Sequence, residues 1–304
     1  MMFKKEERTI LTRRSKGEKI VFGIVFVIFA IYAISLMLPF VLLLFNSLKG
    51  GEEYISDIAA GKNFYPPMKA FFENYINTFK ALKVTDFNGK EINFLQMLFN
   101  SIWYTVLYVG AGVIASSMTA YIVAKYRFRG RRLIDGIAIF SMTIPIIGTT
   151  GSALAMYNTL EIYNTPLLPI LIGFGGFGFN FLILRGFFSN LPWSYAESVF
   201  VDGGGHMTVF FRIMMPQAKP CLVTLFIMAF ITTWNDYQTL LLYMPSYPTL
   251  SSGLYLVQRS LTRNPFEYPV YFAGLMVSVV PIAILFSLFS DVIMSNFTVG
   301  GLKG

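Results

Sequence analysis

The sequence is poor in charged residues, cysteine and histidine. Only 13% of its 304 residues are charged, against roughly 25% in soluble domains. The one cysteine, Cys221, excludes a disulfide framework. The one histidine, His206, excludes a His-rich metal site. With 55% hydrophobic residues and a mean hydropathy of +0.60, the chain has too few polar side chains to cover a soluble protein.

Six stretches without charge are long enough to cross a bilayer, which takes about 20 mostly apolar residues. They are continuously apolar rather than alternating, which favours helices over barrel strands and over the buried helices of a large soluble protein. The first is too long for a signal peptide and is expected to be retained. The sequence therefore predicts an all-α, polytopic membrane protein. Its six transmembrane helices are expected near residues 20–45, 99–123, 134–156, 166–184, 219–242 and 269–292.

Lysine and arginine are unevenly distributed between these helices. Seven lie in a basic segment, 1–19, and five in the loop 125–132. In all, 16 of the 24 fall on one side of the predicted membrane. The positive-inside rule then places both termini in the cytoplasm of a bacterial plasma membrane. It also explains the net charge of +8 without nucleic acid.

The cytoplasmic loop of about residues 185–218 is longer than a minimal connection, and long ordered loops tend to be functional. Pro192 suits the first turn of a short helix, and Gly203 to Gly205 stop it. A second amphipathic run follows over 209–214 and is expected to end at Pro216. The pattern predicts two short helices at the membrane surface, joined by a glycine turn.

This loop contains the pattern LPxxxxExxxxDGxxxxxxFxxIxxPxxxP. Its residues are Leu191, Pro192, Glu197, Asp202, Gly203, Phe210, Ile213, Pro216 and Pro220. The pattern resembles the cytoplasmic "EAA" loop of ABC-importer permeases, in the form of the carbohydrate (maltose-transporter type) branch. The departure from it is that Ser198 and Val199 replace the two alanines. Further landmarks of that branch are Asn100-Ser101, Ile144-Pro145, Trp234-Asn235, Pro248-Thr249-Leu250, Gly253-Leu254 and the tail 300–304.

The resemblance implies a type I ABC-importer permease domain over 20–304, in which this loop forms a coupling helix on an ATP-hydrolysing subunit. Physically, the apolar side of such a helix can bury in a partner groove while acidic side chains meet Arg or Lys. The alternative is a surface loop whose glycines only make a turn. The residues expected to couple are Glu197, Asp202, Gly203, Ile213 and Pro216.

Polar groups inside the predicted helices are candidates for the transport pathway, because they are costly in a membrane. Trp234, Asn235 and Asp236 together offer the stacking surface, amide and carboxylate that commonly hold a sugar. Asn180 follows a glycine-rich stretch. The alternatives are an interfacial Trp234, an interhelical hydrogen bond from Asn235 and close packing at the glycines.

No GxxxxGK[ST] sequence occurs in the chain, so ATP hydrolysis must come from another polypeptide. We expect no catalytic residue, no metal site and no cofactor on this chain, with ATP and magnesium on the partner ATPase. The expected function is a permease subunit that imports a sugar or oligosaccharide by alternating access.

The resemblance implies several partners. They are two ABC ATPase subunits, a second, related permease that completes a heterodimer, and an extracytoplasmic solute-binding protein. The segment 46–98 is expected to face that binding protein or to be a solvated connector. The alternative functions are an ABC permease for a non-sugar solute, an ion-coupled secondary transporter and a membrane enzyme. The last two lack the internal repeats or clustered titratable groups that they would need.

Overall fold

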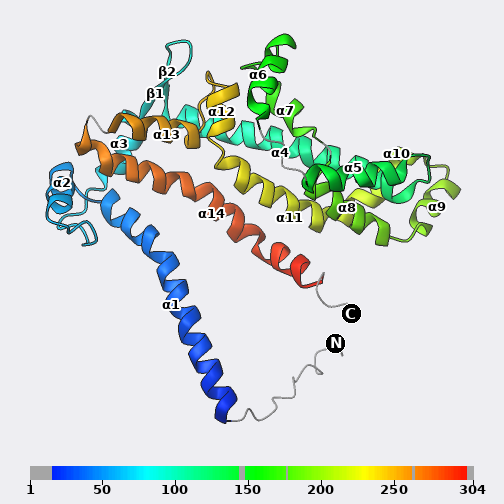
Figure 1. The fold of residues 1–304 in the computed structure, drawn as a ribbon, viewed down its shortest axis with the longest axis horizontal. Coiled ribbons are helices and arrows are strands. Elements are labelled where there is room, and N and C mark those ends of the chain that lie inside the picture. Colours follow the sequence, from blue (N-terminus) through cyan, green and yellow to red (C-terminus); the bar gives the residue numbers. More distant parts are fainter. Residues whose placement is uncertain (1–15, 144–147, 176, 262–263, 300–304) are drawn as a thin grey trace.

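A computed structural model describes residues 16–143, 148–175, 177–261 and 264–299. Most of the predicted basic segment, the Ile144-Pro145 landmark and the tail 300–304 lie outside these residues. The described chain is elongated (Figure 1). In chain order its elements are α1 (Lys16–Ser47), α2 (Gly51–Ala59), α3 (Glu73–Ala81), β1 (Lys83–Thr85), β2 (Glu91–Asn93), α4 (Phe94–Lys125), α5 (Arg131–Thr143), α6 (Thr149–Thr159), α7 (Leu168–Gly173), α8 (Phe179–Asn190), α9 (Ser194–Val201), α10 (His206–Thr208), the π-helix η1 (Val209–Met214), α11 (Met215–Trp234), α12 (Gln238–Tyr243), α13 (Leu250–Leu261), the 3-10 helix η2 (Pro265–Glu267) and α14 (Tyr268–Val299).

The predicted helical class is confirmed, with one addition. β1 and β2 form a small antiparallel hairpin in which Val84 pairs with Ile92. Among the described residues, four continuous helical stretches are long and apolar enough to cross a membrane. They are Gly17–Ser47, Phe94–Lys125, His206–Trp234 and Pro265–Asp291, and they correspond to the first, second, fifth and sixth predicted spans.

The third and fourth predicted spans are not single helices in the described residues. The region 134–156 is divided into α5 and α6, and Gly148, before α6, is left-handed with φ +85°. The region 166–184 is divided into α7 and α8, with Gly178 at φ +145° between them. Such backbone angles suit glycine and interrupt a helix. The count of six transmembrane helices therefore stays a prediction.

The fifth predicted span is shorter at its far end than the sequence suggested. α11 ends at Trp234, residues 235–237 leave the helix, and α12 begins at Gln238. Asp236 accepts a hydrogen bond from the backbone N–H of Thr239 at 3.1 Å. A carboxylate in this position satisfies an N–H at the start of a new helix, so the chain breaks here instead of continuing to residue 242.

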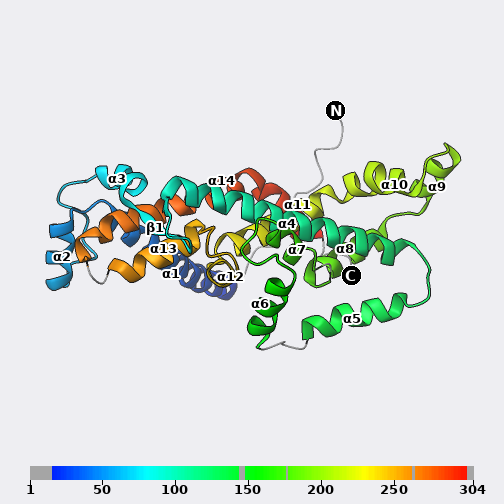
Figure 2. The same ribbon diagram turned by 90° about the horizontal axis from the view of Figure 1, so that it is seen from above.

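α4 runs along the long axis of the molecule, and α7, α8 and α11 pack beside it (Figure 2). It begins with a capping box, in which Asn93 accepts from Gln96 N–H and the Gln96 side chain accepts from Asn93 N–H. Two apolar clusters lie near its two ends. One includes Tyr121 and Phe188, and the other includes Phe94 and Met97. α4 therefore forms the central support of the fold.

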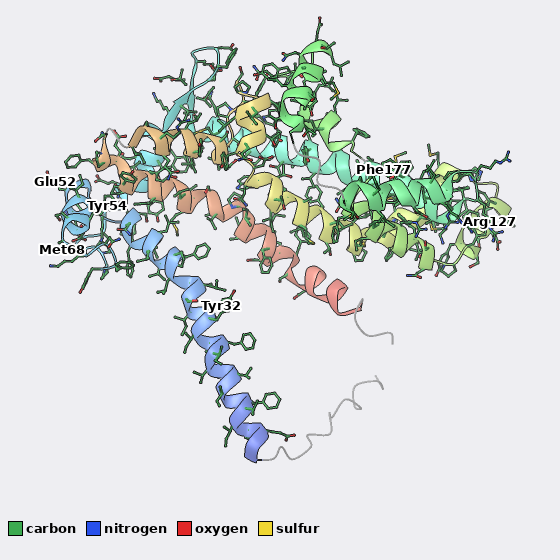
Figure 3. All side chains as sticks on the ribbon, in the orientation of Figure 1. Tyr32, Glu52, Tyr54, Met68, Arg127 and Phe177 are labelled. Carbon is green, nitrogen blue, oxygen red and sulfur yellow. The ribbon has the colours of Figure 1, made fainter. Side chains whose placement is uncertain are left out.

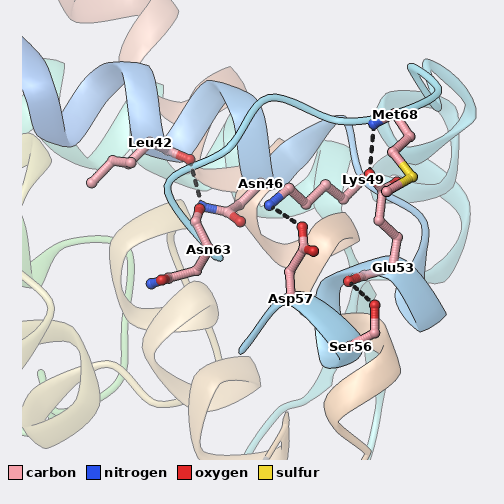
Figure 4. Close-up of polar contacts among 8 residues, drawn as sticks. All are labelled: Leu42, Asn46, Lys49, Glu53, Ser56, Asp57, Asn63 and Met68. Atoms are coloured by element: carbon pink, nitrogen blue, oxygen red, sulfur yellow. Dashed lines mark hydrogen bonds and ion pairs between the residues drawn. The ribbon is translucent and has the colours of Figure 1, made fainter. Parts of the chain in front are cut away.

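α1 diverges from the other helices over most of its length (Figure 1) and packs on α14 near its C-terminal end, and most of its apolar side chains are exposed. Its end is anchored to α2 and α3 by a buried polar cluster, and Figure 4 shows the contact of Lys49 with α2. Lys49, fully buried, pairs with Asp57 at 2.7 Å. The Asn74 amide donates to the carbonyls of Ser47 and Lys49, both at 2.8 Å. The charge of Lys49 is thus compensated where the chain turns out of the apolar helix.

The close contact of α7 with α4 gives a test of this packing. A Cβ at Gly173 would collide with the backbone carbonyl of Tyr108 and lie 3.1 Å from the Ala111 side chain. Gly173→Ala should therefore destabilise the chain by about 1–3 kcal/mol. This loss should appear as a lower apparent melting temperature of the detergent-purified protein. Gly110→Ala, on α4 with open space around it, is the control. Equal melting temperatures for the two variants would contradict this packing.

Candidate functional site

The predicted coupling loop contains one short helix, α9, that follows α8 after the turn at Leu191 to Trp193. Its end is set by Gly203, whose φ of +80° is left-handed, a conformation that glycine adopts without steric cost. The Gly204 N–H donates to the Val199 carbonyl at 2.8 Å. This is the hydrogen bonding typical of a glycine-terminated helix. The predicted first helix and glycine turn are therefore present.

The second half of the loop differs from the prediction. Residues 209–214 do not form a separate surface helix that ends at Pro216. Instead α10, η1 and α11 form one helix from His206 to Trp234. In η1 the Met215 N–H donates to the carbonyl of Phe210, five residues earlier. This wider turn shifts the hydrogen-bond register just before Pro216, so the proline, which has no N–H, is accommodated in the first turn of α11.

The apolar side of α9 packs against the chain itself and not into an open groove. Ala196 is fully buried, and Val199 and Phe200 pack on the same cluster. The Trp193 ring lies edge-on to Tyr126, with centroids 5.8 Å apart. This side therefore holds α9 on the end of α4 and is unavailable to a partner.

The opposite side of α9 is open. Val201 is 87% exposed, although an apolar side chain gains by burial. Glu197 and Asp202 are exposed beside it, and Met207, across the glycine turn, is 66% exposed. Of the other predicted coupling residues, Ile213 is half-buried in η1 and Pro216 is exposed. An apolar centre flanked by two carboxylates is the composition of a protein-docking surface.

Two polar contacts fasten the loop to the end of α4. The Lys125 ammonium donates to the Leu191 carbonyl, just before α9. The Tyr126 hydroxyl and His206 Nδ1 are 2.8 Å apart, at the start of α10. Two adjacent residues at the end of α4 therefore hold the chain both before α9 and after the glycine turn. The sequence did not indicate this role for His206.

A second feature is a cavity of about 230 Å³ at the other end of α11. It lies between the end of α11, α13 and α14, and its polar and aromatic walls include Trp234, Asn235, Tyr237, Ser251, Tyr255 and Gln258. Tyr237 and Tyr255 are stacked, with ring centroids 4.6 Å apart. Flat aromatic faces together with amide and hydroxyl groups are suited to a polyol.

The structure brings only part of the predicted pathway set to this cavity. Asn235 is exposed there, and its amide donates to the Ile231 carbonyl at 2.8 Å. Trp234 forms part of the wall but is 3% exposed, and its indole donates to the Ser278 carbonyl at 3.2 Å. Asp236 and Asn180 are not among the lining residues. Asn180 is half-buried in the first turn of α8.

Sequence reasoning missed the contribution of α13. Ser251, Tyr255 and Gln258 are spaced i, i+4 and i+7 and so fall on one face of a helix. That periodicity was available in the sequence, but the segment follows the last residue of the fifth predicted span. The pair Arg185–Asp135, with a shortest contact of 2.5 Å, was also missed, because Asp135 lies in the third predicted span and Arg185 was placed in the loop that follows the fourth. In the described part of the chain, no group of three His, Cys, Asp or Glu residues is arranged to hold a metal.

A sequence profile described as "Binding-protein-dependent transport system inner membrane component" matches residues 111–298. The chain belongs to this family. The match spans the loop and the cavity, and it confirms the resemblance that the loop pattern indicated. The chain is therefore a multi-pass membrane protein and a transport permease subunit.

Relatives over most of the chain are permeases of sugar and oligosaccharide transport systems. The sulfoquinovosyl glycerol permease of Agrobacterium fabrum is 26% identical, over 92% of this chain and 93% of the relative. The maltodextrin permease of Bacillus subtilis is 30% identical, over 72% and 83%. A chain of a bacterial ABC transporter involved in alginate import has the same fold, with a TM-score of 0.74 and 24% identity over 92% of this chain and 99% of that one.

The left-handed backbone at Gly203 gives a test of the loop. Gly203→Val should strain the turn by about 1–3 kcal/mol and raise the population of locally opened loop by roughly tenfold. Chymotrypsin cleavage at Phe200 in the detergent-purified protein should accelerate accordingly. Gly205→Ala is the control, because Gly205 has φ −94° and open space for a Cβ. Equal cleavage rates for the wild type and both variants would rule out a strained turn.

Proposed function

We propose that this chain is one of two permease subunits of an importer for a sugar or oligosaccharide, driven by separate ATP-hydrolysing subunits. The observation that carries the proposal is the continuous helix from His206 to Trp234. This helix begins in the coupling loop and ends at the cavity. At 1.5 Å per residue, such a helix spans roughly 40 Å. A displacement imposed on the loop would therefore reach the cavity directly.

The ATPase subunit would dock on the open side of α9. Val201 and Met207 supply apolar area, and Glu197 and Asp202 supply negative charge for Arg or Lys of the partner. Gly203 shapes the turn between them. Ile213 and Pro216 would transmit the displacement within the helix His206–Trp234. Ile213 is half-buried in that helix, and Pro216 lies within the first turn of α11.

The sugar would contact the cavity through Tyr237, Tyr255, Asn235 and Gln258. The volume of the cavity, about 230 Å³, is below the roughly 300 Å³ of the smallest typical ligand pockets. A second permease that completes the wall accounts for this small size. That related chain would form a heterodimer with this one, two ATPase subunits would lie on the cytoplasmic side, and a solute-binding protein would deliver substrate to the segment 46–98.

In this proposal the chain sits in a bacterial plasma membrane with both termini in the cytoplasm, as its lysine and arginine distribution suggests. Transport is by alternating access. Closure of the ATPase subunits on ATP moves α9, the pathway opens outward to receive sugar, and hydrolysis reopens it inward. ATP and magnesium belong to the partner subunits.

A charge placed in the centre of the docking side should break the ATPase contact. Val201→Asp buries an unpaired carboxylate in the interface, which costs several kcal/mol. The co-purifying ATPase subunit should therefore fall by at least about tenfold when the tagged chain is isolated in mild detergent. Phe87→Asp, at a position that is 71% exposed in the turn between β1 and β2, should leave the yield unchanged. Full retention of the ATPase subunit by Val201→Asp would refute the assignment of this surface.

Substrate contact in the cavity has a separate test. Tyr255→Ala removes one of the two stacked rings and should lower sugar-stimulated ATP hydrolysis by the reconstituted importer about fivefold at subsaturating sugar, since such a contact contributes about 1 kcal/mol. Gln238→Ala, exposed and outside the cavity lining, is the control. A reconstituted importer that responds to peptides or polyamines but to no sugar would support the non-sugar alternative instead.

A further inference from the structure

Four arginines lie within six residues, with Arg127 and Arg129 in the loop after α4 and Arg131 and Arg132 at the start of α5. Arg131 is half-buried and the other three are exposed. None forms an ion pair with a carboxylate in the described part of the chain, where Asp135, the nearest acid in sequence, pairs with Arg185. Arg127 lies at one end of the molecule, far from Met68 and Glu52 (Figure 3). Four positive charges without an ion-pair partner therefore gather in one short stretch.

The elements on either side hold this loop at the edge of the membrane. α4, which precedes it, is long and apolar enough to cross a bilayer. α5 begins at Arg131 and immediately exposes large apolar side chains, with Leu133 67%, Ile137 48% and Phe140 63% exposed. A cationic turn followed by an exposed apolar helix face is the arrangement of a segment whose charges lie among lipid headgroups. The guanidinium groups are thus expected at the depth of the phosphates.

We propose that this arginine cluster binds the phosphate of an anionic phospholipid. A guanidinium presents two parallel N–H donors that match two phosphate oxygens. Basic clusters at a membrane-helix end favour anionic lipids. The neighbouring Lys125 ammonium is already used by the Leu191 carbonyl, so the arginines supply the site.

An acidic surface of the ATPase subunit is the competing occupant. Two observations favour the lipid. The exposed apolar residues of α5 continue directly from the arginines, as an acyl chain would require. The proposed docking surface on α9 lies on the other side of α4 and α8 from α5 (Figure 2). The lipid inference depends on the membrane placement of the chain and not on the substrate or on the docking surface.

Native mass spectrometry of the detergent-purified importer, titrated with phosphatidylglycerol or phosphatidylcholine, tests this site. The wild type should bind phosphatidylglycerol more tightly. Arg129→Gln with Arg132→Gln should weaken that binding on the order of tenfold, since each cation near the surface contributes appreciably. The variant Arg129→Lys with Arg132→Lys should be intermediate, because it keeps charge but loses the bidentate geometry. The control is Lys80→Gln with Lys90→Gln, two exposed lysines of the segment 46–98, which should bind like the wild type.

Three results would overturn the proposal. The first is an unchanged phosphatidylglycerol preference in the double glutamine variant. The second is displacement of the lipid by an equal concentration of inorganic phosphate, which would make the site a free-anion site. The third is loss of the ATPase subunit from that variant with its lipid preference intact, which would assign the arginines to a protein interface.

Discussion

The packing of α4 against its neighbours fixes both candidate functional regions at once. At one end of α4, Lys125 and Tyr126 hold the proposed coupling loop. Near the other end, the Asn100 amide donates to the Pro248 carbonyl at 2.9 Å, and Ser101 Oγ accepts from Leu250 N–H at 2.7 Å. These two contacts position the start of α13 and therefore one wall of the cavity. A single apolar helix thus sets the distance between the loop and the cavity.

The helix from His206 to Trp234 connects the same two regions by a second route. Within it, the π-helical turn Val209–Met214 departs from regular α-helical hydrogen bonding. π-helical turns occur mostly at functional positions, and this one lies between the docking surface and the membrane-crossing part. The two connections suit a transporter, because α4 can hold the frame while the second helix carries displacement from one end to the other.

The sequence predicted those parts of the molecule that depend on local pattern. The long apolar stretches of α1, α4, α11 and α14 were predicted because a bilayer requires about 20 apolar residues in succession. α9 and its glycine turn were predicted from Pro192 and Gly203. The course of the chain through Pro216 was predicted wrongly, because a proline read alone ends a helix and a preceding π-turn has no sequence signal of its own. The burial of Trp234 and the stacking of Tyr237 on Tyr255 depend on contacts between distant segments, so the candidate pathway was predicted only in part.

The most direct test of the account is site-specific photo-crosslinking in intact cells from a photoreactive amino acid at position 201. A covalent product should form between this chain and an ATP-hydrolysing subunit. No such product should form when the photoreactive residue stands at position 87. A chain that crosslinks from position 201 only to lipid or to other membrane proteins, with the ATPase subunit present in the cell, would contradict the assignment of this loop as the coupling surface.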